Sequence, residues 1–126
     1  MVWQLIKLIR WVLCYEGKDN MLKTISNVID SLINFRDSRG WKKYHNLKNL
    51  AESVNIEASE ILEIFQWKTN KDELSSEEQT HLKGELADTL IYLFYMCDQL
   101  GVDPLKIVEE KLEYNKGRKW DFDHKK

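Results

Sequence analysis

Turn-forming residues are scarce in this chain. Its 126 residues include one proline and five glycines. The dipeptides that close tight β-hairpins, such as Asn-Gly and Asp-Gly, do not occur, and no segment sustains the alternation of apolar and polar residues that is typical of a half-buried strand. These absences exclude most β architectures, and the sequence predicts an all-α protein.

Cysteine is also scarce, with Cys14 and Cys97 only. There is no CxxC motif and no cluster of cysteine with histidine, which argues against a structural zinc site and against a disulfide scaffold. This cysteine usage favours a cytoplasmic protein.

An excess of charge of one sign is missing as well. Nineteen Lys and Arg residues stand against 21 Asp and Glu, for a formal net charge of -2. The overall charge therefore gives no electrostatic footprint for a nucleic acid polymer, and an anionic ligand needs a local site. With 43% hydrophobic and 32% charged residues, the chain is expected to fold as one soluble domain.

The first 14 residues, "MVWQLIKLIRWVLC", are strongly apolar, but they include Lys7 and Arg10 and are too short to span a bilayer. They also lack the small-residue cleavage site of a signal peptide, so no membrane span is expected. Three interpretations stay open: a helix that packs on the body or on a second subunit, an extension upstream of a natural start at Met21, and a helix on a membrane surface. The expected organisation is an amphipathic extension at 1–20, one domain at 21–120 and a tail at 121–126.

Apolar residues at helical spacing, together with start and stop signals, predict four helices in that domain. Ser75 and Glu78 fit a capping box, Gly101 fits a C-terminal stop, and Asp103 followed by Pro104 fits a further helix start. The predicted helices cover 21–37, 47–68, 76–100 and 104–115.

Two pairs of carboxylates stand in apolar surroundings. Glu57 and Glu60 lie in "NIEASEILEIFQW", and Glu85 and Asp88 lie in "GELADTLIY". Residues three apart on a helix face the same side. The second helix continues about 12 Å beyond Glu60, and the third rises about 14 Å before Glu85. In an antiparallel hairpin the two pairs therefore lie at the same height.

Four carboxylates that face one point repel each other, at about 4 kcal/mol for two unit charges 4 Å apart at an effective dielectric of 20. A cation between them removes this repulsion. Oxygen ligands without His or Cys select Mg²⁺, with Mn²⁺ as the alternative, and such sites usually bind substrate phosphates. The residues thus indicate phosphate-ester or anhydride hydrolysis, with solvated acidic faces as the alternative for either pair alone.

The segment "FRDSRGWKKYHNLKNLAESVNIEASEILEIFQWKT", followed by "KGELADTLIYLFYMCDQLGVDPLKIVEEKLEYNKGRK", resembles the MazG-like nucleoside triphosphate pyrophosphohydrolases. The resemblance is strongest to the small branch that includes the dCTP pyrophosphatases. The family pattern is EExxE, a spacer and ExxD. Ile56 replaces the first glutamate, and the other four positions match Glu57, Glu60, Glu85 and Asp88.

The resemblance implies a four-helix bundle whose antiparallel helical hairpin carries the metal site, assembled as a homodimer or homotetramer. The implied reaction is Mg²⁺-dependent hydrolysis of a nucleoside triphosphate to the monophosphate and pyrophosphate, as house-cleaning of the nucleotide pool. All four matching carboxylates are then the metal ligands and catalytic residues.

The resemblance also implies substrate-binding residues. Trp41 and Trp67 match base-stacking tryptophans, and Tyr92 matches a position near the sugar and base, although all three could be core or rim aromatics. Further binding residues on the last helix would be Lys111, Asn115 and Arg118. His45 is expected to order its loop. Leu32 stands where the dCTP enzymes carry a histidine, which puts cytosine specificity in doubt.

There are three rival interpretations. Phosphoribosyl-ATP and dimeric dUTP pyrophosphohydrolases share the fold. A carboxylate-bridged di-iron bundle would need histidine three residues after its glutamates, and neither pair has one. The non-enzymatic alternative is a helical interaction module whose acidic pairs lie on the surface.

Overall fold

The computed structural model describes residues 24–120, so the predictions for 1–20 and 121–126 lie outside the described residues. Within 24–120 the chain forms four α-helices and one short 3₁₀ helix, with no strand. The all-α prediction with four helices is confirmed. The elements are α2 (Ile25–Ser38), η1 (Trp41–Tyr44), α3 (Leu47–Ile64), α4 (Ser76–Leu100) and α5 (Pro104–Lys116).

Each α-helix begins at a side chain that caps it. Thr24, Asn46, Ser75 and Asp103 each accept a hydrogen bond from the backbone N–H three residues later, which satisfies a donor that has no partner inside the helix. Glu78 completes the predicted capping box by accepting from the backbone N–H of Ser75 at 2.8 Å. The predicted starts of α4 and α5 are therefore confirmed.

The predicted bounds differ from the structure at two helices. Thr24 is extended, so α2 begins at Ile25 rather than at residue 21. The second helix ends at Ile64 rather than near 68. Beyond it, the N–H groups of Phe65 and Gln66 bond to carbonyls three residues back, which tightens the chain out of the α-helix although the apolar spacing continues.

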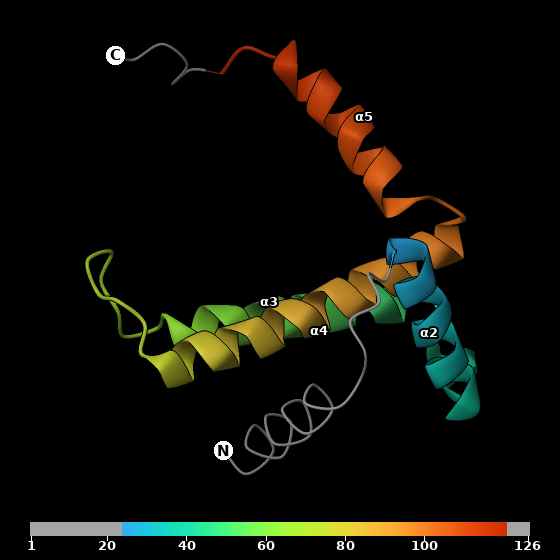
Figure 1. Cartoon of the computed structure of the whole chain (residues 1–126), viewed down its shortest axis with the longest axis horizontal. Coiled ribbons are helices and arrows are strands. Elements are labelled where there is room, and N and C mark those ends of the chain that lie inside the picture. The colour runs from blue at the N-terminus through green and yellow to red at the C-terminus, as the bar shows by residue number, and fades with distance from the viewer. Residues whose placement is uncertain (1–23, 121–126) are drawn as a thin grey trace.

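The longest packed unit is the hairpin of α3 and α4, which run side by side in Figure 1. Residues 65–75 connect them, and Lys68 ties this connection to the first turn of α4 through a 2.8 Å ion pair with Glu78. α2 crosses the later part of α4, where the Tyr95 hydroxyl donates to the Leu32 carbonyl at 2.8 Å. These contacts hold the loop that contains Trp41 beside the hairpin.

The interior of a single chain is small. Among the described residues, Leu50 and Tyr95 are the buried apolar side chains, and Arg36, Glu57 and Glu85 are buried as well. Leu86, Leu90 and Leu93 of α4 remain largely exposed. α5 projects away from the hairpin in Figure 1, and its Leu105, Val108 and Leu112 are also exposed. Within residues 24–120, the chain therefore exposes apolar side chains along α4 and α5.

None of the helices within residues 24–120 is long and apolar enough to cross a membrane.

Candidate metal centre

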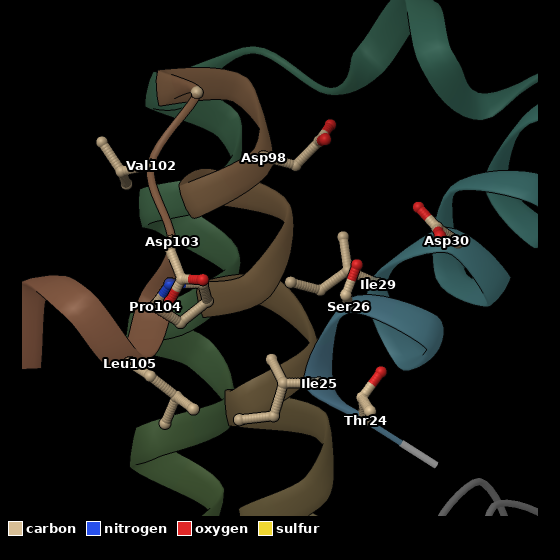
Figure 2. A pocket seen from close by; sticks show the side chains of 11 residues that line it. Thr24, Ile25, Ser26, Ile29, Asp30, Asp98, Val102, Asp103, Pro104 and Leu105 are labelled. Atoms are coloured by element: carbon tan, nitrogen blue, oxygen red, sulfur yellow. The ribbon is translucent and has the colours of Figure 1, made fainter.

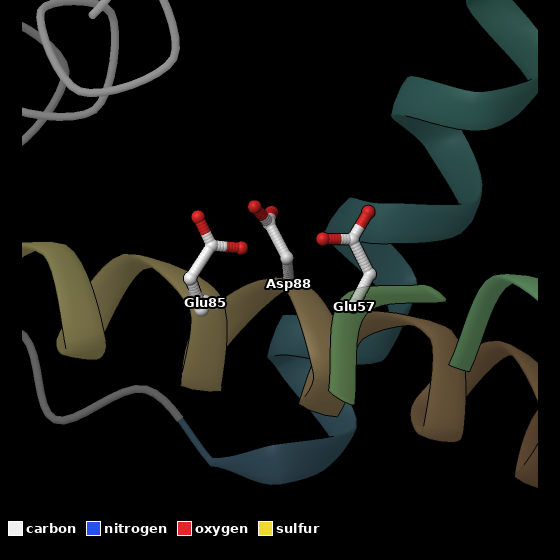
Figure 3. A group of neighbouring side chains, drawn as sticks. All are labelled: Glu57, Glu85 and Asp88. Atoms are coloured by element: carbon white, nitrogen blue, oxygen red, sulfur yellow. The ribbon is translucent and has the colours of Figure 1, made fainter. Parts of the chain in front are cut away.

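Three carboxylates meet at the middle of the hairpin. Glu57 comes from α3, and Glu85 and Asp88 come from successive turns of α4 (Figure 3). Each offers one oxygen, and these oxygens all lie within 4.8 Å of one another. Glu57 and Glu85 are only 8% and 4% exposed. The hairpin thus brings Glu57 close to two carboxylates that stand at least 28 positions later in the sequence.

This grouping is electrostatically costly without a cation. Ionised carboxylates at such separations repel, and burial lowers the dielectric that would screen them. The donors are hard oxygens, and the cluster within the described residues has no nitrogen or sulfur ligand. The set therefore fits a divalent cation of the Mg²⁺ or Mn²⁺ type and does not suit zinc or copper.

Glu60 lies one turn beyond Glu57 on α3. It is half-buried, and its Oε2 atom is shielded from solvent, but it is not a member of the group within 4.8 Å in the described part of the chain. Its role as a fourth ligand stays a prediction.

A histidine that the sequence analysis does not single out stands beside the cluster. The Nε2 atom of His81 lies 3.1 Å from Oε1 of Glu85, one helical turn later. The two residues have the HxxxE spacing, which places two side chains on one helix face. This spacing is the feature of the sequence that could have indicated a contact between His81 and Glu85.

A cavity of about 210 Å³ opens directly beside the carboxylates. Its wall includes Glu57 and Asp88 together with the aromatic residues Phe35, Trp41 and Tyr92. The rings of Phe35 and Trp41 meet edge to face, with centroids 5.5 Å apart. An adjoining cavity of about 410 Å³ shares Trp41, His45 and Tyr92. The structure therefore places two of the three predicted aromatic residues next to the cluster.

His45 lines both cavities. Its ring packs edge to face on Tyr95, with centroids 4.7 Å apart, and its Nδ1 atom is buried without a hydrogen-bond partner among residues 24–120. Burial lowers the pKa of His45, with the nearby Arg36 charge acting in the same direction. Burial also raises the pKa of the Tyr95 hydroxyl. This end of the cavity therefore favours uncharged side chains.

The other predicted binding residues lie elsewhere in the chain. Trp67, just after α3, is 89% exposed. Neither cavity beside the carboxylates is lined by Trp67, by Lys111 or Asn115 of α5, or by Arg118, which follows the end of α5. The two cations contact aromatic rings near them in sequence, Lys111 over Tyr114 at 4.5 Å and Arg118 over Trp120 at 4.2 Å.

A larger cavity of about 460 Å³ lies between α2, the end of α4 and the start of α5 (Figure 2). Asp30, Asp98 and Asp103 line it, and its described wall contains no Lys or Arg. Three acidic side chains without a cation disfavour a polyphosphate, so this cavity does not suit a nucleotide.

The model of the MazG-like family matches residues 53–126, a segment that contains all four predicted carboxylates. The chain belongs to the MazG-like family. The match confirms the resemblance seen in the sequence.

Similar proteins and a similar solved structure support this assignment. Over 88 residues, the chain is 34% identical to dCTP pyrophosphatase 1 of Homo sapiens and 33% identical to that of Bos taurus. Each alignment covers 67% of this chain and 52% of the relative, so the chain spans about half the length of these relatives. A pyrophosphatase structure from Archaeoglobus fulgidus is similar with a TM-score of 0.65 and 40% identity, over 82% of this chain and 100% of that one.

Proposed function

We propose that this MazG-like protein hydrolyses a (deoxy)nucleoside triphosphate to the monophosphate and pyrophosphate with the help of Mg²⁺. The observation that supports this most strongly is the group formed by the buried Glu57 and Glu85 with the half-buried Asp88, beside an aromatic cavity. The dCTP pyrophosphatases at about one third identity and the archaeal pyrophosphatase support the same reaction class.

The carboxylates would hold the metal, with Glu57, Glu85 and Asp88 as ligands and Glu60 as the fourth. Mn²⁺ is the alternative ion for the same oxygen donors. When bound, Mg²⁺ supplies positive charge against the phosphates and lowers the pKa of a coordinated water. A glutamate of this group would accept a hydrogen bond from the attacking water and aim it at the α-phosphorus, which makes it the positioned base of the reaction.

The base would bind in the 210 Å³ cavity. Trp41 offers a ring face that is already fixed by its edge contact with Phe35, and Tyr92 lies one turn after Asp88 on α4. Base stacking on such rings tolerates different bases. Leu32 also lines this cavity and offers no side-chain hydrogen bond to a base. The site would therefore select among bases less strictly than one with a polar group at this position.

The phosphates would be bound by Lys111, Asn115 and Arg118 of a second copy, since none of the three lines the cavities beside the carboxylates of its own chain. The exposed apolar side chains of α4 and α5 support such an association. Trp67, almost fully exposed in one chain, would likewise contact a neighbouring subunit. We propose a homodimer or homotetramer that acts on the cytoplasmic nucleotide pool.

A panel of dNTPs and NTPs incubated with the protein and Mg²⁺ tests this function, with products separated by ion-exchange chromatography. The expected products are the monophosphate and pyrophosphate. Release of orthophosphate with a diphosphate would indicate attack at the γ-phosphorus and would overturn the proposed reaction. Absence of turnover with every nucleotide would favour the interaction module.

A further inference from the structure

We propose that His81 is a positioning residue that fixes the Glu85 carboxylate for metal binding. This inference rests on the proposed metal centre. It assigns a role to a residue that is neither one of the candidate ligands nor part of the acidic motif of the family.

The geometry gives the first argument. His81 and Glu85 are four residues apart on α4, so both side chains emerge on one helix face. The 3.1 Å separation between His81 Nε2 and Glu85 Oε1 is a normal hydrogen-bond distance. An ionised carboxylate can only accept, so Nε2 carries the proton and donates. This bond forms in either charge state of the ring.

The position of His81 shows whether it is a metal ligand or a residue that supports a ligand. A metal ligand would join Glu57, Glu85 and Asp88 within 4.8 Å, and among the described residues His81 does not. Its side chain is 31% exposed, whereas the Glu85 side chain is 5% exposed. His81 therefore lies on the outer side of Glu85, between that carboxylate and solvent, as a support rather than a ligand.

The energetic argument concerns the freedom of the Glu85 side chain. Repulsion from Glu57 and Asp88 favours rotamers that turn the Glu85 carboxylate away from the cluster before a metal binds. The bond to His81 opposes this rotation and keeps the oxygens in place. Removing a hydrogen-bonding group behind a metal ligand typically costs about 10-fold to 100-fold in metal affinity.

Two amide substitutions at His81 test whether Glu85 needs a hydrogen-bond donor or only a side chain of similar volume at this position. In His81→Gln the amide nitrogen sits at the same number of bonds from the backbone as Nε2, so a donor toward Glu85 is retained. In His81→Asn the amide nitrogen takes the place of Nδ1 and falls short of Glu85. His81→Ala removes the side chain. The control is Thr80→Val, because Thr80 bonds to its own helix at the Ser76 carbonyl.

The experiment is a titration of each full-length variant with Mn²⁺ alone, with the free ion measured by electron paramagnetic resonance. His81→Ala and His81→Asn are expected to raise the Mn²⁺ dissociation constant about 10-fold or more, whereas His81→Gln and Thr80→Val stay near the wild-type value. Circular dichroism verifies that each variant is folded.

The outcomes distinguish this inference from the function on which it rests. If wild-type protein binds Mn²⁺ and His81→Ala binds it equally well, the role of His81 is overturned while the metal centre stands. Equal weakening in His81→Gln and His81→Ala would also overturn it, because the donor would then not matter. If wild-type protein binds no Mn²⁺, the metal centre itself is overturned, and this inference with it.

Discussion

Glu57 of α3 and Glu85 of α4 are both buried, although few apolar side chains are buried among residues 24–120, and both belong to one group of carboxylates within 4.8 Å. Burial of like charges opposes folding unless a cation accompanies them. The stability of this protein should therefore depend on a divalent metal, and a variant with fewer charges should lose that dependence.

The substitution Glu57→Gln tests this relation. It keeps the side-chain volume and removes one charge, so in EDTA it should stabilise the protein by about 1 kcal/mol, which raises Tm by about 4 °C for a domain of this size. Mg²⁺ should raise the Tm of wild-type protein but not that of the variant. Thermal unfolding by circular dichroism measures both effects.

The matched control is Glu63→Gln, which removes a charge from an exposed position of the same helix. It should change neither the Tm in EDTA nor the response to Mg²⁺. If Glu57→Gln instead destabilised the metal-free protein and kept the wild-type response to Mg²⁺, Glu57 would not be a ligand.

If the active site combines Asp88 of one subunit with Lys111 of another, two inactive variants should restore activity when they are mixed. Asp88→Ala and Lys111→Ala should each be nearly inactive alone. After mixing and reassociation, about a quarter of the sites combine an intact Asp88 from one copy with an intact Lys111 from another. Pyrophosphate release should therefore recover to about a quarter of the wild-type rate. A mixture as inactive as its components would place both residues in the same chain's site.

Trp41 should contribute to nucleotide binding and not to metal binding. Loss of a stacking ring costs about 1 to 3 kcal/mol, so Trp41→Ala should raise KM for the nucleotide by about 5-fold to 150-fold. Trp41→Phe keeps a ring and should retain most of the affinity. The Mg²⁺ concentration for half-maximal rate should be unchanged in both. An unchanged KM in Trp41→Ala would remove the cavity from the proposed base site.

The lowered pKa of His45 predicts how stability changes with pH. As pH falls below the ordinary value of 6.5, the unfolded chain takes up a proton at His45 before the folded chain does. The free energy of unfolding should therefore decrease from about pH 6.5 downward, until the folded protein also protonates. Asp37 and Glu78 also have lowered pKa values, but their ordinary values of 3.8 and 4.5 place their effects at lower pH.

Urea unfolding at pH 7.5, 6.5 and 5.5 measures this dependence in wild-type protein and in His45→Gln. The variant has no group that titrates at this position, so its stability should change less over this range. The same slope in both proteins would show that His45 does not carry the effect.

The local signals in the sequence were sufficient to predict the helices. Ser75 with Glu78, and Asp103 with Pro104, use short-range hydrogen bonds that depend little on the rest of the fold, so the starts of α4 and α5 were predicted to the residue. The end of α3 was not, because the apolar spacing continues through Phe65 while the backbone already turns.

The meeting of Glu57 with Glu85 and Asp88 was also predictable, because helix rise and an antiparallel hairpin together fix the heights of the two pairs. The sequence could not separate Glu57 from Glu60, since both lie on the same face and the difference depends on how α3 is rotated against α4. The HxxxE spacing of His81 and Glu85 also occurs on solvated helices, so the spacing alone does not predict a role for His81. The burial of Glu85, which is seen only in the structure, makes the contact significant.

The sequence does not predict which surface α5 contacts. The capping residues predict where α5 begins, but α5 projects from its own hairpin, with Lys111 on the helix and Arg118 just beyond its end. In the proposed assembly a surface of a second copy would decide where these cations act, and neither periodicity nor charge along one chain specifies that surface.

The most direct test of the central claim measures pyrophosphate release from dCTP as a function of Mg²⁺ concentration, for wild-type protein and for Asp88→Asn. Wild-type protein should release no pyrophosphate in EDTA, and its rate should rise to saturation with Mg²⁺, with one dCMP formed per pyrophosphate. Asp88→Asn, which keeps the shape of the side chain, should be slower by about 100-fold or more at every Mg²⁺ concentration. Turnover that persists in EDTA, or that is unaffected in Asp88→Asn, would contradict a metal centre at these carboxylates.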